Sequence, residues 1–153
     1  MLTECSKIAV IDTETNYDNE VMPIGTVIAD THDLSLIERQ YLILDPEYKK
    51  PAMFSVELSH KRAKIDAVSA RKTVIRYVTD ILERNGVTDI FAYNATFDCG
   101  HLPELSSYRW YDIMKIAAYK QYNYAITDRM PCCRTGKLKC SYGAESIYRM
   151  QLL

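Results

Sequence analysis

The chain contains 153 residues, a length that predicts one domain with a real hydrophobic core. Its composition, 48% hydrophobic and 25% charged, is that of a globular protein and argues against a disordered chain or a coiled coil. A formal net charge of −1 excludes a protein that coats long nucleic acid by charge alone, although it allows an enzyme that binds a few nucleotides with the help of metal ions.

Other sequence features predict where the protein works. No apolar run is long enough to span a membrane, and residues 1–6 lack the pattern of a signal peptide. The five cysteines are odd in number and irregularly spaced, which favours a reducing compartment over a disulfide framework. We therefore expect a cytoplasmic protein that has no contact with a membrane.

The first predicted strand carries the clearest chemical signal. Residues 7–16 read KIAVIDTETN, and an apolar run bounded by polar residues is typical of a buried strand. Residues two apart point to the same face of a strand, so we expect Asp12 and Glu14 to project together. Neighbouring carboxylates repel unless a cation or a proton lies between them, and Mg²⁺ and Mn²⁺ prefer carboxylate oxygen. The alternative interpretation is a strand that simply ends in solvated acids.

Two more strands are expected next in the chain. Residues 21–29 and 34–44 each read as a strand, and the turn residues 30–33 join them. Pro23 and Gly25 indicate an irregular or edge position in the first of these strands. Three strands connected by short turns predict an antiparallel meander.

A basic segment and a helix are expected between residues 45 and 86. Basic side chains are irregularly spaced in the first part of this region, at Lys49, Lys50, Lys61, Arg62 and Lys64. Such a charge run is either a solvated face or a rim that meets phosphates. From residue 69 to residue 85 apolar side chains recur at helical spacing, and Gly86 lies where a C-terminal cap belongs. This pattern predicts a helix.

The remaining residues predict a strand–helix unit followed by smaller elements. Residues 87–93 read as a short strand, and Asn94 is positioned as the N-cap of a helix over 95–105. This unit, placed after a meander, predicts a mixed sheet with helices packed against it. We then expect an edge strand over 109–111, an amphipathic helix over 112–122, a loop over 127–136 and a helical stretch over 142–153.

A second acidic feature lies in the strand–helix unit. Residues 91–98 read FAYNATFD, which places Asp98 in the first turn of the helix, just beyond the C-terminal end of the strand. Open α/β sheets usually bind ligands in that crevice. An acid in a first helical turn also has a simpler explanation, because the helix macrodipole favours negative charge there.

Taken together, the two acidic features resemble a known family. IDTET at residues 11–15 and YNATFD at residues 93–98 are similar to the first two motifs of the DEDD superfamily of 3′–5′ exonucleases, which includes polymerase proofreading subunits and oligoribonuclease. The resemblance extends from residue 8 to residue 114 and includes Ile24-Gly25 and the stretch WYDIM at 110–114. It implies an α/β, ribonuclease H-like fold, in which a mixed sheet combines an antiparallel three-strand meander with parallel strands and is flanked by helices.

The resemblance also implies a reaction and its catalytic residues. Members of the superfamily hydrolyse phosphodiesters at 3′ ends with two Mg²⁺ or Mn²⁺ ions. By this resemblance Asp12 would bridge both ions, Glu14 would hold the ion that carries the attacking water, and Asp98 would hold the second ion. These three acids are the expected catalytic and metal-binding residues.

Four further residues are expected to bind substrate by the same resemblance. The backbone at Thr13 would approach the scissile phosphate or the terminal sugar, and Thr15 would support the acids. Asn94 and Phe97 match positions beside the terminal nucleotide, where Phe97 would stack on a base without selecting its sequence. Phe97 is equally compatible with plain core packing.

The expected substrates are 3′ ends of single-stranded DNA or RNA, with a nucleoside monophosphate as product. A polymerase or repair assembly is a further expected setting. Two alternatives remain open: a catalytically weak nucleic-acid-binding module of the same fold, and a ribonuclease H-like endonuclease.

The sequence departs from the superfamily in its last motif. The family uses a fourth carboxylate that follows a general base, as His-x4-Asp or Tyr-x3-Asp, and neither His60 nor His101 has an Asp at that spacing. The pairs Tyr108/Asp112 and Tyr124/Asp128 match the second spacing, as twelve tyrosines make easy by chance. We interpret residues 1–153 as a single exonuclease-like domain truncated before the final catalytic helix, which would bind divalent metal weakly and be nearly inactive alone.

Two features near the C-terminus have competing interpretations. Cys132, Cys133 and Cys140 suggest either a zinc site or ordinary thiols, and their spacing favours thiols. The basic loop that contains Arg129, Arg134, Lys137 and Lys139 is a candidate for contact with substrate.

Overall fold

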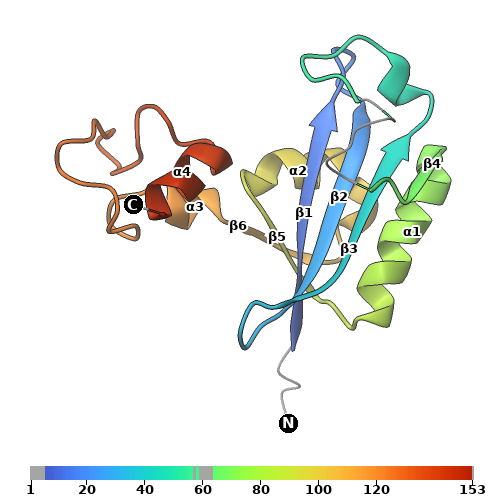
Figure 1. Ribbon diagram of the computed structural model, residues 1–153, viewed down its shortest axis with the longest axis horizontal. Helices are drawn as coiled ribbons and strands as arrows, with labels where there is room; N and C mark the ends of the chain where they lie inside the picture. Colours follow the sequence, from blue (N-terminus) through green and yellow to red (C-terminus); the bar gives the residue numbers. More distant parts are fainter. Residues whose placement is uncertain (1–5, 57, 59–63, 153) are drawn as a thin grey trace.

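One six-stranded sheet organises the fold. The computed structural model describes residues 6–56, 58 and 64–152 (Figure 1). In these residues the strand order is β4-β3-β2-β1-β5-β6. The strands are β1 (Lys7–Thr15), β2 (Val21–Asp30), β3 (Leu36–Leu44), β4 (Ala67–Ser69), β5 (Asp89–Ala92) and β6 (Arg109–Asp112).

The sheet is mixed, as the sequence predicts. Strands β1, β2 and β3 form an antiparallel meander, β5 runs parallel to β1 and to β6, and β4 runs parallel to β3. With the helices that flank it, this sheet has the ribonuclease H-like α/β fold. Strand β4 was not expected, because three residues carry too little periodicity to be recognised. His60, Lys61, Arg62 and Cys5 lie outside the described residues.

Helix α1 (Arg71–Arg84) covers one face of the meander and confirms the helix expected over 69–85. Its apolar stripe is fully buried in the main core, against β1, β2 and β3, and comprises Val74, Val78, Ile81 and Leu82. Burying each such side chain contributes about 1.5–3 kcal/mol. Truncating one of them, as in Ile81→Ala, is therefore expected to destabilise the fold by about 2–5 kcal/mol.

A shift in the ladder between β1 and β2 confirms the irregular position expected at Pro23 and rules out the alternative of an edge position. Strand β2 lies between β1 and β3, so Pro23 is not at a sheet edge. Thr13 pairs with Ile24 but Thr15 pairs with Val21, so that Met22 and Pro23 face the single residue Glu14. A proline lacks the N–H that a regular ladder needs, and an irregular position of this kind tolerates it.

Two helices are shorter than expected. Helix α2 (Ala95–His101) has Leu102 as its C-cap and goes no further, because Pro103 disfavours helical backbone at the residue before it. A 3-10 turn, η2 (Pro103–Leu105), follows. Helix α3 (Met114–Ala117) replaces the long helix expected over 112–122. After it, the carbonyl of Ala118 accepts a hydrogen bond from the Leu138 N–H, so tertiary pairing with a distant segment replaces helical bonding.

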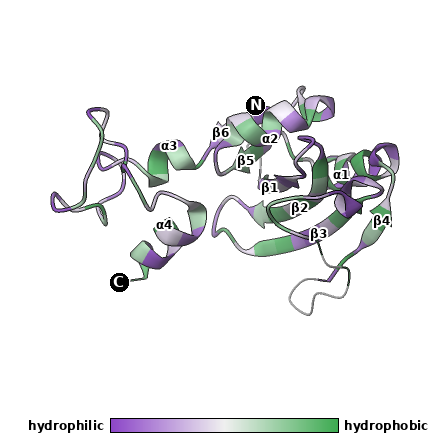
Figure 2. Cartoon of the chain, turned by 90° about the horizontal axis from the view of Figure 1, so that it is seen from above, coloured by the Kyte–Doolittle hydropathy of each residue, from purple (hydrophilic) through white to green (hydrophobic). Residues whose placement is uncertain are grey.

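The C-terminal lobe, residues 114–152, has a small core of its own. It contains α3, a long loop and α4 (Ala144–Gln151), and the loop lies at the opposite end of the molecule from α1 (Figures 1 and 2). Its buried hydrophobic residues are Ala118, Ile126, Leu138 and Ile147. The remaining helix, η1 (Glu47–Lys49), follows β3. None of the helices in the described part of the chain combines the length and the apolar character that crossing a bilayer requires.

Candidate active site

Strand β1 presents two acids on one face of the sheet. Along this strand Ile11 and Thr13 are buried, whereas Asp12 and Glu14 alternate with them and are exposed. The strand thus uses its alternation to bury apolar groups on one side and to offer two carboxylates on the other. The register with β2 is irregular at Glu14, where two residues of β2 lie opposite the second acid.

Asp98 is brought to this strand from helix α2. Its side chain is only 2% exposed. Its Oδ1 accepts hydrogen bonds from the Thr13 backbone N–H at 3.0 Å and from the Thr13 hydroxyl at 2.8 Å. A residue far along the sequence is therefore fixed beside the residue that separates Asp12 from Glu14.

Burial raises the pKa values of all three acids, and repulsion from neighbouring carboxylates adds to the increase at Glu14 and Asp98. Burial raises the pKa of Asp98 to about 6, and the charge of Asp12 adds to this increase, while hydrogen bonds from Thr13 oppose it. Desolvation also raises the pKa of Glu14, with smaller contributions from Asp12 and Asp98. Although Asp12 is open to solvent on one side, desolvation by the surrounding protein raises its pKa too. The three acids therefore share one electrostatic environment.

The donor set suits a hard divalent cation but does not enclose one. Desolvation raises the pKa of each of these carboxylates, and repulsion from Asp12 adds to the increase at Glu14 and Asp98, so a cation bound between them would supply a favourable counter-charge. Within the described residues, however, no group of three or more His, Cys, Asp or Glu side chains is arranged to hold a metal ion. Asp98 instead directs Oδ1 to Thr13.

The four residues expected to contact substrate lie around these acids. Thr13 is buried and bonded to Asp98, and Thr15 lies at the end of β1 opposite Val21. Asn94 begins α2 in a left-handed conformation, with φ 67°, but its side chain does not cap the helix. Phe97 lies outside the two hydrophobic cores of the described chain and is 36% exposed, with its ring centroid 4.3 Å from that of His101. This placement favours an accessible ring over plain core packing.

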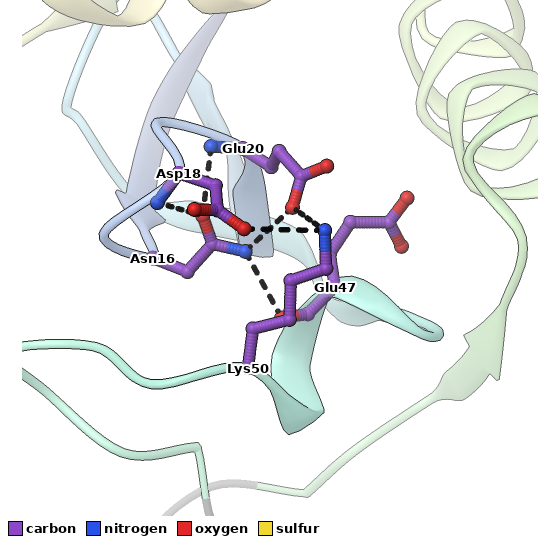
Figure 3. A network of polar contacts seen from close by, with 5 residues as sticks. All are labelled: Asn16, Asp18, Glu20, Glu47 and Lys50. Atoms are coloured by element: carbon purple, nitrogen blue, oxygen red, sulfur yellow. Dashed lines mark hydrogen bonds and ion pairs between the residues drawn. The ribbon is translucent and has the colours of Figure 1, made fainter.

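A polar network that the sequence did not reveal fixes the turn after β1 (Figure 3). The buried side chain of Asn16 donates to Glu20 Oε2 at 2.8 Å and to the Glu47 carbonyl at 3.2 Å. Its Oδ1 accepts from the backbone N–H groups of Asp18 at 2.9 Å and Glu20 at 3.0 Å. Lys50 completes the network with its Nζ 2.6 Å from Glu20 Oε2. The only signal in the sequence was an Asn directly after the acidic stretch, which is also ordinary turn chemistry.

His101 joins this turn to helix α2. Its Nδ1 lies 2.7 Å from the Phe97 carbonyl oxygen, and its Nε2 lies 2.9 Å from Asn19 Oδ1. The contact between His101 and Asn19 links helix α2 to the turn that follows β1. The sequence could not show this link, because residues 19 and 101 are far apart along the chain.

The two Tyr-x3-Asp pairs occupy other positions. Asp112 Oδ1 accepts hydrogen bonds from the backbone N–H groups of Asn94 at 3.0 Å and Met114 at 2.9 Å, a structural role at the starts of two helices. Tyr124 is 94% exposed on the loop of the C-terminal lobe, and the Asp128 carboxylate is fully exposed there. The site has therefore gained no fourth carboxylate from either pair.

Comparisons with known proteins agree with the fold. No protein-family model matches the sequence, and no curated protein matches it. Solved structures do match. A full-length 3′-exonuclease superposes with a TM-score of 0.59 at 14% identity, over 96% of this chain and 80% of that one.

Two further structures are similar to the same extent. The nuclease domain of 3′hExo, a DEDDh family member bound to rAMP, has a TM-score of 0.54 at 13% identity, over 96% of this chain and 90% of that one. E. coli Exonuclease I in complex with a dA16 oligonucleotide has a TM-score of 0.55 at 13% identity, over 96% of this chain and 40% of that one. The chain has the fold of the DEDD-superfamily 3′–5′ exonucleases.

Proposed function

We propose that this chain, which has the fold of 3′–5′ exonucleases, is a divalent-metal-dependent nuclease that removes nucleotides from 3′ ends of single-stranded DNA or RNA. The observation that carries the proposal is the docking of Asp98 on Thr13, which joins a helix to the strand bearing Asp12 and Glu14. An acid that is 2% exposed, with its pKa raised by burial, is costly to ionise unless a cation is bound nearby.

The three acids are the residues that would hold the metal. Mg²⁺ or Mn²⁺ ions, when bound, supply an activated water and neutralise charge on the phosphate. Asp12 and Glu14 offer exposed carboxylates, and Asp98 is kept in one orientation by the two bonds from Thr13. Because this cluster is negative, it repels a phosphodiester in the absence of cations, so we expect substrate binding at the site to require divalent metal.

The neighbouring aromatic ring supports a sequence-independent preference for single strands. Phe97 immediately precedes Asp98 and is partly exposed, and its ring is steadied by His101. A base at the end of an unpaired strand can stack on such a ring, and stacking does not select one base over another.

A nuclease assay with end-labelled substrates tests the proposal. A 5′-labelled 20-mer incubated with Mn²⁺ should give a ladder that shortens from the 3′ end, whereas a single-stranded circle should stay intact. Asp12→Asn should abolish the ladder. Cleavage of the circle would instead identify an endonuclease.

A second candidate function follows because neither Tyr-x3-Asp pair supplies a fourth carboxylate at the site. A general base typically accelerates such a reaction about 10²- to 10⁴-fold, and neither Tyr-x3-Asp pair supplies one at this site. A catalytically weak module that binds single strands is therefore the alternative. It predicts retention of the labelled strand in a binding assay and no shortening after prolonged incubation with Mn²⁺.

A further inference from the structure

Charge is distributed unevenly along this chain. Residues 114–152 contain seven Lys or Arg residues and two Asp or Glu residues, whereas residues 1–113 contain twelve basic and eighteen acidic residues. The overall charge of −1 thus conceals a strongly basic C-terminal lobe beside an acidic main domain. A basic lobe of this kind attracts polyanions.

Most of the basic side chains in the lobe are available to a ligand. The two acids of the described lobe already have basic neighbours, since Asp128 lies 4.0 Å from Lys120 and Glu145 lies 2.6 Å from Arg149. Those pairs leave five basic residues of the lobe without an acidic partner inside it. Four of the five are exposed, at Lys115, Arg129, Arg134 and Lys139.

Exposed tyrosines are interspersed with these charges. Tyr122, Tyr124 and Tyr148 are 61%, 94% and 65% exposed. The Lys137 Nζ lies 4.2 Å from the centroid of the Tyr142 ring, so cation and ring are already combined in one place. Basic side chains that meet phosphates, together with aromatic rings that meet bases, form the usual surface for single-stranded nucleic acid.

The lobe presents these groups from a folded scaffold. The buried Asn123 Nδ2 donates to the Ala117 carbonyl at 2.7 Å, and its Oδ1 accepts from Gln151 Nε2 at 2.7 Å, which ties α3 to α4. The turn that carries Arg134 is closed by a 2.9 Å hydrogen bond from the Gly136 N–H to the Cys133 carbonyl. The backbone that carries these side chains is therefore ordered and is not an unstructured tail.

The lobe is also joined directly to the acid-bearing helix. The hydroxyl of Tyr93 donates to the Tyr142 carbonyl, and Tyr93 packs against the lobe core. Tyr93 is the residue before Asn94, which begins helix α2. Asp112 bridges the starts of α2 and α3. A strand whose 3′ end lies at Asp98 would thus have the lobe beside it.

We infer that the C-terminal lobe binds the body of a single-stranded nucleic acid, on the 5′ side of the end that is processed, through unpaired basic side chains and exposed tyrosines. This inference rests on the proposed function for the direction of the strand, but binding itself is independent of catalysis. Unstacked bases are needed to reach the tyrosine rings, so single strands should bind better than duplex.

The test compares two variants with the same change in charge. Anisotropy of 5′-fluorescein-dT20 is measured in EDTA, which prevents cleavage, for wild type, for Arg134→Gln/Lys139→Gln, and for the matched control Lys72→Gln/Arg76→Gln on the exposed face of α1. Each phosphate contact on a single strand changes the salt slope by about 0.7, so losing two should weaken binding by roughly 10- to 25-fold near 0.1 M salt and lower the slope by about 1.4. The control should bind like wild type.

A tyrosine variant separates base stacking from charge. Loss of one stacked base lowers affinity by roughly fivefold or more, so Tyr124→Ser should weaken binding of dT20 but not of inorganic polyphosphate. Equal affinity of the two double variants, or equal effects of Tyr124→Ser on both ligands, would overturn the inference. Failure of the exonuclease proposal appears differently, as an intact labelled strand in Mn²⁺ with binding unchanged.

Discussion

Replacing Asp98 by Asn should stabilise the metal-free protein at neutral and alkaline pH. Burial raises the folded-state pKa of Asp98 from 3.8 to about 6, so the folded protein holds this proton more tightly than the unfolded chain does. Stability therefore falls as the pH rises from about 4 through 6, because the ionised carboxylate must stay buried in the fold. An Asn side chain removes that charge, and its Oδ1 can still accept both hydrogen bonds from Thr13.

The size of the effect follows from the pKa shift. A shift of about two units at about 1.36 kcal/mol per unit corresponds to about 3 kcal/mol at pH 8. That amount is a large fraction of the 5–15 kcal/mol typical of a small domain. At pH 4 the carboxyl is protonated in the folded state and about half protonated in the unfolded state, so most of the advantage of Asn should vanish.

Denaturant unfolding in EDTA at pH 8 and at pH 4 measures this difference. The midpoint should rise for Asp98→Asn at pH 8 without a change in the slope m, and the stability at pH 4 should lie within about 0.5 kcal/mol of wild type. Asp80→Asn on the exposed side of α1 is the control and should change stability by no more than about 0.5 kcal/mol. A destabilised Asp98→Asn at pH 8, or an equal gain at both pH values, would refute the assignment of Asp98 as a buried, strained acid.

Three further substitutions test the surroundings of the site and the lobe. Thr13→Val removes the hydroxyl that donates to Asp98, so it should raise the pKa of Asp98 further. The free energy of unfolding should fall by about 1.5–3 kcal/mol at pH 8 and by less at pH 4, as measured by denaturant unfolding at the two pH values. Asn16→Ala removes four hydrogen bonds from the turn after β1; it should cost about 2–4 kcal/mol by the same assay, and a loss below about 0.5 kcal/mol would contradict the network. Gly136→Ala would place a Cβ 2.1 Å from Gln121 Oε1, at a residue whose φ is +88°. The substitution should destabilise the lobe by about 1–2 kcal/mol. Amide exchange should therefore be faster in residues 118–139 and unchanged in α1.

The sequence predicted the elements whose signals are local. The apolar run before Asp12, the helical spacing of α1 and the glycine after it each depend on a few neighbouring residues, and the structure places the meander, α1 and β5 where these signals indicated. The match to the superfamily motifs likewise led to the right fold, because IDTET and YNATFD occupy a strand end and a helix start.

Features that depend on distant partners were not predictable in this way. The hydrogen bond between the hydroxyl of Thr13 and Asp98 joins residues 85 positions apart. The helix expected over 112–122 stops early because Ala118 and Lys120 bond to residues 136–138. Pro23 indicated an irregular or an edge position, but only the pairing of β2 with its neighbours shows that this residue lies in a central strand, at a register shift opposite Glu14.

Mn²⁺ binding, measured by the loss of the free-ion signal in electron paramagnetic resonance, tests most directly whether the acids at positions 12, 14 and 98 act as one cation site. Wild type should bind Mn²⁺ in competition with Mg²⁺, and Asp12→Asn or Asp98→Asn should each weaken binding by at least tenfold, while Asp80→Asn leaves it unchanged. Equal binding by all four proteins, or none by wild type at millimolar Mn²⁺, would contradict the proposal.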